Sequence, residues 1–184
     1  MSSRLSSLSV AVRPKGGTAE RIRGEVAERA HGVVDRVELL ATGITQGEIK
    51  QRLANGALLR EYRGVYRVGH RAPSVEASYL AVVKACGEGA VLSGRAAGHL
   101  FGLLRARAAP EPEVTARTAH YIEGIKTRRS RSMDPRDCTR WKRIPVTTVA
   151  RTLVDLAAVL AFDDLARACH EAGVRYRTTP AEVE

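Results

Sequence analysis

The sequence predicts an α+β protein of two units, a winged helix-turn-helix followed by a small mixed α/β unit. Within residues 32–68, two short helical patterns precede two strand-like runs joined at a glycine turn. This is the order of elements in a winged helix-turn-helix. A Gly- and Pro-bearing turn cluster at residues 69–73 then separates this stretch from a longer mixture of helix and strand patterns, which predicts the second unit.

The chain begins with a segment that has no sustained hydrophobic period. Residues 1–17 are serine-rich and basic, so we expect a flexible tail. From Thr18, Ile22, Val26 and Ala30 recur every four residues, which predicts the first of the three helices that a winged module needs. The unit is therefore expected to span residues 18–70.

The second helix of the predicted module is short. It follows a brief strand at residues 32–34, and Val37, Leu39 and Leu40 give it an apolar stripe. Thr42-Gly43 is expected to end it.

The third helix has signals at both ends. Thr45 is placed to cap it, Ile49 and Leu53 recur at i, i+4, and Asn55-Gly56 stops it. Residues 58–62 and 65–68 then form a hairpin, the expected wing. Polar side chains face solvent on this helix: Gln46, Glu48, Lys50, Gln51 and Arg52.

The second unit, residues 74–172, is expected to mix helices and strands. Two helices are predicted at 74–86 and 94–103. A third is predicted to start at a cap on Thr147 or Thr148 and to end at about residue 160. A fourth is predicted from about 162 to 172, with Leu165, Ala168 and Cys169 facing inward. Strands are predicted at 113–116 and 121–126, and an edge strand, because of its proline, at 144–148. Residues 90–93 are expected to form either a short apolar strand or the lead-in to the next helix. Residues 173–184 read as a tail holding the start of a further element.

Basic charge is concentrated in one segment. The 184 residues carry a net charge of +10, and residues 126–143 alone hold eight cations against two carboxylates. Such an excess favours a polyanionic partner, and guanidinium groups suit phosphate oxygens. The alternative is a solvated basic loop. The candidate phosphate contacts are Lys126, Arg128, Arg129, Arg131, Arg140, Lys142 and Arg143.

Several function classes are disfavoured. No run approaches the length of a membrane helix, and the start lacks the apolar block of a secretory signal, so we expect a cytoplasmic protein. The three cysteines and five histidines lack ligand spacing, and Ser93 lacks a nucleophile elbow. Asp134 and Asp137 flank Pro135 as turn and cap residues. We therefore expect no metal, no cofactor and no enzymatic activity.

The third helix is the expected DNA reader. Amide side chains can pair with adenine, and Lys or Arg with guanine, in the major groove, whereas Thr45 and Arg36 are expected to touch phosphates. The alternative is a solvated helix face in a protein-binding winged helix. The predicted DNA-binding residues are Arg36, Thr45, Gln46, Lys50, Gln51, Arg52, Arg60 and Arg63.

Four stretches carry a family resemblance: HGVVDRVELLATGIT, GEIKQRLANGALLREYRGVYRVGH, ACGEGAVLSGRAAGHLFGL and RSRSMDPRDCTRWKRIPVTTVARTLVDLAAVL. The ordered series, from about residue 20 to 172, resembles the AbiEi-type antitoxins of type IV toxin–antitoxin systems. The resemblance implies an N-terminal winged helix-turn-helix that represses the operon's own promoter. It also implies an antitoxin unit that counters a nucleotidyltransferase toxin.

The chain departs from longer relatives that end in a nuclease-like region, because it stops near the start of that region and shows no acidic cluster for magnesium. We expect a non-enzymatic regulator of double-stranded promoter DNA, with two copies on repeated sites as a homodimer or by paired binding. The alternative is a protein-interaction remnant of a longer nuclease-tailed relative, without a DNA site.

Overall fold

The computed structural model describes residues 31–69, 74–105, 107–117, 122, 125–130 and 133–183. Within them, six α-helices and two β-sheets confirm the α+β class. The predicted tail and first helix, residues 1–30, lie outside the described residues. The helices described here begin with the second one predicted.

The first sheet has three antiparallel strands in the order β1-β3-β2. Both strands of the predicted hairpin are confirmed, as is the third helix with its Thr45 cap. The elements are β1 (Val33–Asp35), α2 (Arg36–Ala41), α3 (Gln46–Ala54), β2 (Leu58–Tyr62) and β3 (Val65–Val68).

Strand alternation gives this sheet two buried faces. Val34 and Tyr66 pack with α2 and α3 around a small core that also holds Leu39. Val33 and Val65 point the other way and join the main core of the chain. Because successive residues face opposite sides of a strand, one short sheet links two cores.

The predicted apolar stripe of α2 is wrong at two of its three positions. Leu39 is buried, at 1% exposure, but Val37 is 76% exposed and Leu40 is 39% exposed. The helix has only six residues, less than two turns, so its inward face holds one of the three large side chains.

The second sheet has five strands in the order β6-β5-β4-β8-β7. They are β4 (Val91–Leu92), β5 (Glu113–Ala116), β6 (Lys126–Arg129), β7 (Cys138–Trp141) and β8 (Ile144–Thr147). The predicted edge position of β8 is wrong, because β8 lies between β4 and β7. Its parallel ladder with β4 registers only Leu92 with Val146, so Pro145 falls outside that register.

The strand predicted at 121–126 is also wrong. β6 starts at Lys126, Ile122 and Ile125 belong to no strand, and residues 121, 123 and 124 lie outside the described residues. β6 pairs in parallel with β5 through the basic residues that follow.

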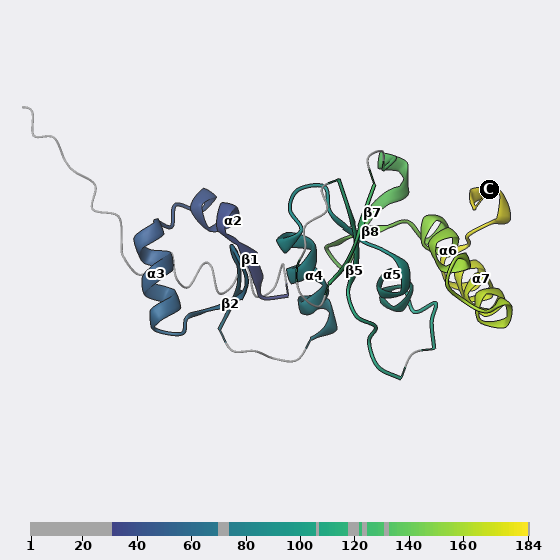
Figure 1. Cartoon of the computed structure of the whole chain (residues 1–184), viewed down its shortest axis with the longest axis horizontal. Helices are drawn as coiled ribbons and strands as arrows, with labels where there is room; N and C mark the ends of the chain where they lie inside the picture. Colours follow the sequence, from purple (N-terminus) through teal and green to yellow (C-terminus); the bar gives the residue numbers. More distant parts are fainter. Residues whose placement is uncertain are drawn as a thin grey trace, which may run out of the picture.

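Four more helices complete the fold: α4 (Val75–Ala85), α5 (Gly94–Leu100), α6 (Val149–Ala157) and α7 (Phe162–Tyr176). α4 lies between the two sheets, whereas α5, α6 and α7 pack together on the far side of the second sheet (Figure 1). α7 extends past the predicted end at 172 and Cys169 is exposed rather than inward, while Ala168 and Ala172 are buried. Short 3-10 turns occur at Pro135–Asp137 and Pro180–Glu182.

Among the described residues, no helix is both long and apolar enough to cross a bilayer. The same residues contain no cluster of three or more His, Cys, Asp or Glu side chains that could hold a metal ion.

Candidate nucleic-acid interface

α3 has one buried and one exposed face. Ile49 is buried and Leu53 packs against the small core, while Gln46, Lys50 and Gln51 are exposed. Gln46 and Lys50 are four residues apart, as are Gly47 and Gln51, so these positions fall on one broad face of the helix. Gly47 and Ala54 are exposed on the same face, so small residues flank the polar ones and let another surface approach the helix closely.

Thr45 serves the helix itself. Its hydroxyl donates to Glu48 Oε2 at 3.0 Å, and the Glu48 N–H donates to the Thr45 hydroxyl at 3.2 Å. The Thr45 N–H and hydroxyl also lower the pKa of the Glu48 carboxyl. This capping box uses the groups that were expected to contact phosphate, and it places a carboxylate at the start of α3.

Arg52 is less available than the sequence suggests. Its side chain is 19% exposed and one guanidinium nitrogen lies 4.0 Å from Glu48. The Nη1 atom is buried without a hydrogen-bond partner in the described structure. Lys50 and Gln51 are therefore the better candidates for base contacts.

The remaining predicted contacts flank α3 on neighbouring elements. Arg36 opens α2, and its N–H donates to the Gly64 carbonyl at 2.8 Å, which ties α2 to the β2–β3 turn. Arg36, Arg60 and Arg63 are all exposed. Residues 31–69 carry six cations against four carboxylates, a net charge of +2.

The basic segment at 126–143 does not form one surface, because β6 and β7 occupy opposite edges of the five-stranded sheet. On β6, Lys126 and Arg128 lie 3.6 and 4.0 Å from the buried carboxylate of Glu113. Arg129 is exposed, and Arg131 lies outside the described residues.

The basic residues on β7 and in the turn after it also have different surroundings. Arg140 and Arg143 line a cleft of about 1130 Å³ that α2 and α4 also border. Lys142 pairs with Glu76 at 2.7 Å. The described basic residues of 126–143 therefore lie on separate surfaces of the fold.

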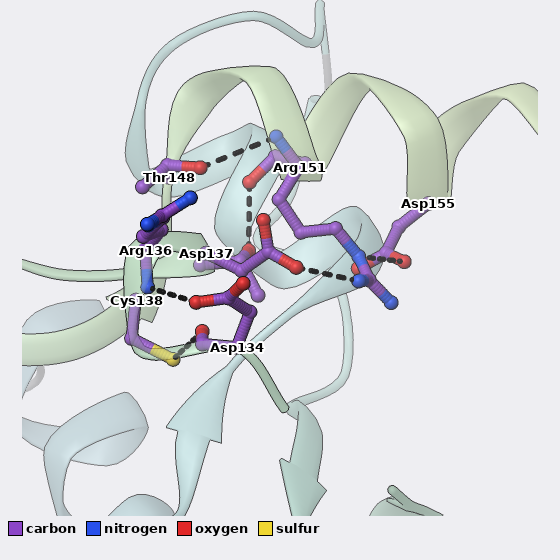
Figure 2. A network of polar contacts seen from close by, with 9 residues as sticks. Asp134, Arg136, Asp137, Cys138, Thr148, Arg151 and Asp155 are labelled. Atoms are coloured by element: carbon purple, nitrogen blue, oxygen red, sulfur yellow. Dashed lines mark hydrogen bonds and ion pairs between the residues drawn. The ribbon is translucent and has the colours of Figure 1, made fainter. Parts of the chain in front are cut away.

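A polar network fixes the start of β7. Asp134 caps the 3-10 turn by accepting the Arg136 N–H at 2.8 Å, as expected for a cap residue. Arg151 reaches Asp137 at 2.8 Å and Asp155, four residues on along α6, at 3.2 Å (Figure 2). α6 thereby holds the turn that precedes β7.

One ionic contact joins the first sheet's elements to α4. Lys84 Nζ lies 2.9 Å from Asp35 and also pairs with Glu38. Asp35 caps α2, and Glu38 completes its capping box. Lys84 therefore anchors the start of α2 to the main body.

Replacing Lys84 with methionine is expected to lower the melting temperature at pH 7 by about 2–4 °C, since a partly exposed ion pair contributes about 1 kcal/mol. Burial raises the pKa of Asp35, but hydrogen bonds from the Glu38 N–H and from Lys84 outweigh it, so the net pKa is lowered. The stabilisation is thus complete above the ordinary pKa of Asp35 and is lost as the pH falls through its lowered value.

The difference in melting temperature between wild type and Lys84→Met should therefore start to shrink below about pH 4, as measured by circular dichroism from pH 7 to about pH 2. Lys50→Met, at an exposed position, is the control. A difference that stays constant over this range contradicts the role of the Asp35 carboxylate.

Neither a protein-family model nor a curated protein sequence matches the chain. Among solved structures, it is similar to the crystal structure of the RV2827C protein from Mycobacterium tuberculosis. The sequence identity is 14% and the TM-score is 0.49, over 94% of this chain and 75% of that chain. A likeness at this level carries no inference about function.

Proposed function

We propose that residues 31–69 are the described part of a winged helix-turn-helix that binds double-stranded DNA, with α3 in the major groove and the β2–β3 hairpin as the wing. The observation that carries this proposal is the exposed face of α3, where Gln46, Lys50 and Gln51 alternate with small residues. An α-helix fits the major groove, and these side chains match the donors and acceptors of base edges.

The exposure and contacts of the side chains support a narrower set of contact residues than the sequence alone. Lys50, Gln46 and Gln51 are proposed to contact bases, while Arg36 and the hairpin residues Arg60 and Arg63 contact the flanking backbone. Arg52 and Thr45 are proposed to support the helix instead, because Glu48 engages both of them.

In the wider proposal, the chain is an AbiEi-type antitoxin that represses its own promoter in a type IV toxin–antitoxin system. This part rests on the sequence resemblance. A nucleotidyltransferase toxin is its expected counterpart, and a dimer would match repeated promoter sites. A gene for such a toxin next to this one would support the assignment, whereas a solitary gene would favour a stand-alone regulator.

Fluorescence anisotropy with a labelled duplex from upstream of the gene tests DNA binding. We expect submicromolar affinity, weaker binding to a scrambled duplex, and an affinity that falls steeply between about 50 and 200 mM salt as counterions are released. No binding to either duplex at low salt would sink the proposal and leave the protein-interaction alternative.

A further inference from the structure

Trp141, the only tryptophan in the chain, is held in place and still open to solvent. It ends the edge strand β7, and its ring centroid lies 5.9 Å from Phe101 and 5.5 Å from Tyr176. The Tyr176 hydroxyl donates to the Phe101 carbonyl at 2.8 Å. The indole is nevertheless 38% exposed. The packing thus fixes the ring and leaves part of it accessible.

Cations adjoin the residues of this aromatic cluster along the chain. Lys142 follows Trp141, and Arg175 and Arg177 flank Tyr176. Burial raises the pKa of Tyr176, and the charges of Arg175 and Lys142 oppose that effect.

The surrounding charge is only partly neutralised. Glu76 pairs with Lys142 and Glu171 with Arg175, each at 2.7 Å. The side chain of Arg177 has no carboxylate partner among the described residues. The surface therefore keeps positive charge beside an accessible indole.

Three cations near the cluster occupy unfavourable backbone conformations. Lys142 and Arg143 form the two-residue turn between Trp141 and Ile144, with φ of +46° and +65°. Positive φ at both positions is typical of a type I′ turn, where Asn-Gly is preferred. Arg177 ends α7 with φ of +57°, where glycine is preferred. Asn or Gly would adopt these backbone conformations at a lower conformational free energy than Lys or Arg. Residues in such strained conformations are common at functional sites.

We propose that the surface formed by Trp141, Lys142, Arg175 and Arg177 binds single-stranded nucleic acid. An unpaired base stacks on the indole, and the adjoining phosphates contact the cations. A duplex does not offer this contact, because its base faces are already stacked. α7 lies at the opposite end of the molecule from α3 (Figure 1), and Lys142 pairs with Glu76 at the start of α4. No residue of this surface belongs to the proposed duplex site.

The sole tryptophan reports directly on this site. Titration with a 12-nucleotide oligothymidylate at low salt is expected to quench the Trp141 emission, with micromolar affinity that weakens as salt rises. A 12-base-pair duplex or inorganic polyphosphate should cause little quenching. The absence of quenching by oligothymidylate, or equal quenching by polyphosphate, would overturn the proposal.

The Arg177→Gly variant distinguishes a loss of oligothymidylate binding from a loss of stability. We expect the melting temperature to rise by about 2–4 °C, because glycine relieves the left-handed cap. Anisotropy of labelled oligothymidylate should show binding weakened about 3- to 10-fold. The slope of log affinity against log salt concentration should become shallower by about 0.7, as expected for the loss of one phosphate contact. A protein stabilised by this change that binds as tightly as wild type contradicts the proposal.

Arg167→Ala is the matched control, since Arg167 lies on the same helix and pairs with Asp164 at 2.8 Å. It should leave oligothymidylate binding unchanged. The Lys50→Ala, Gln51→Ala double variant should also retain it, so failure of the duplex proposal and failure of this one are distinguishable.

Discussion

Replacing Leu39 with alanine is expected to lower the free energy of unfolding by about 2–4 kcal/mol. Leu39 is 1% exposed and belongs to the small core between α2, α3 and the first sheet. Among the described residues this core has six buried members, so a cavity at Leu39 removes a large share of its contacts. Urea unfolding followed by circular dichroism measures the loss.

Leu40→Ala is the matched control, because it removes the same atoms from the next residue, which is 39% exposed. Its cost is expected to stay below about 1 kcal/mol. Equal losses for the two variants would contradict the orientation of α2 described above.

Local signals in the sequence predicted much of the fold. Thr45 and Glu48 lie three residues apart, so the cap of α3 needs only neighbouring residues. The i, i+4 pair of Arg151 and Asp155 is local in the same way. The β2–β3 hairpin follows from two short apolar runs and the Gly64 turn. Such features depend on residues within about one turn of each other.

Features that depend on distant partners could not be predicted. β6 reads Lys-Thr-Arg-Arg and has no apolar alternation; it becomes a strand beside β5, where Glu113 lies close to two of its cations. β8 contains a proline and reads as an edge, yet β7 pairs along its outer side. Neither arrangement is encoded within the strand itself.

In the candidate site too, some features follow from neighbouring residues and others depend on distant parts of the fold. The exposed positions of Gln46, Lys50 and Gln51 follow from helical periodicity, but the partial burial of Arg52 depends on how its side chain packs in the folded chain. Sequence reasoning also passed over Trp141. Its position as the sole tryptophan inside the basic segment was a usable signal, whereas its contact with Tyr176 came only from the fold.

The double substitution Lys50→Ala, Gln51→Ala is expected to weaken duplex binding at least about 30-fold. Each base contact contributes about 1–3 kcal/mol, and two such contacts are removed. Both side chains are exposed and outside the small core, so the melting temperature should change by less than about 2 °C. A loss of affinity without a loss of stability identifies a recognition role.

The most direct test of the central claim compares this double variant with Arg167→Ala and wild type on the upstream duplex, by anisotropy at one salt concentration. We expect the double variant to lose affinity and also to lose the preference for the upstream duplex over a scrambled one, while Arg167→Ala matches wild type. If the double variant binds the upstream duplex as tightly and as selectively as wild type, α3 is not the DNA-reading helix.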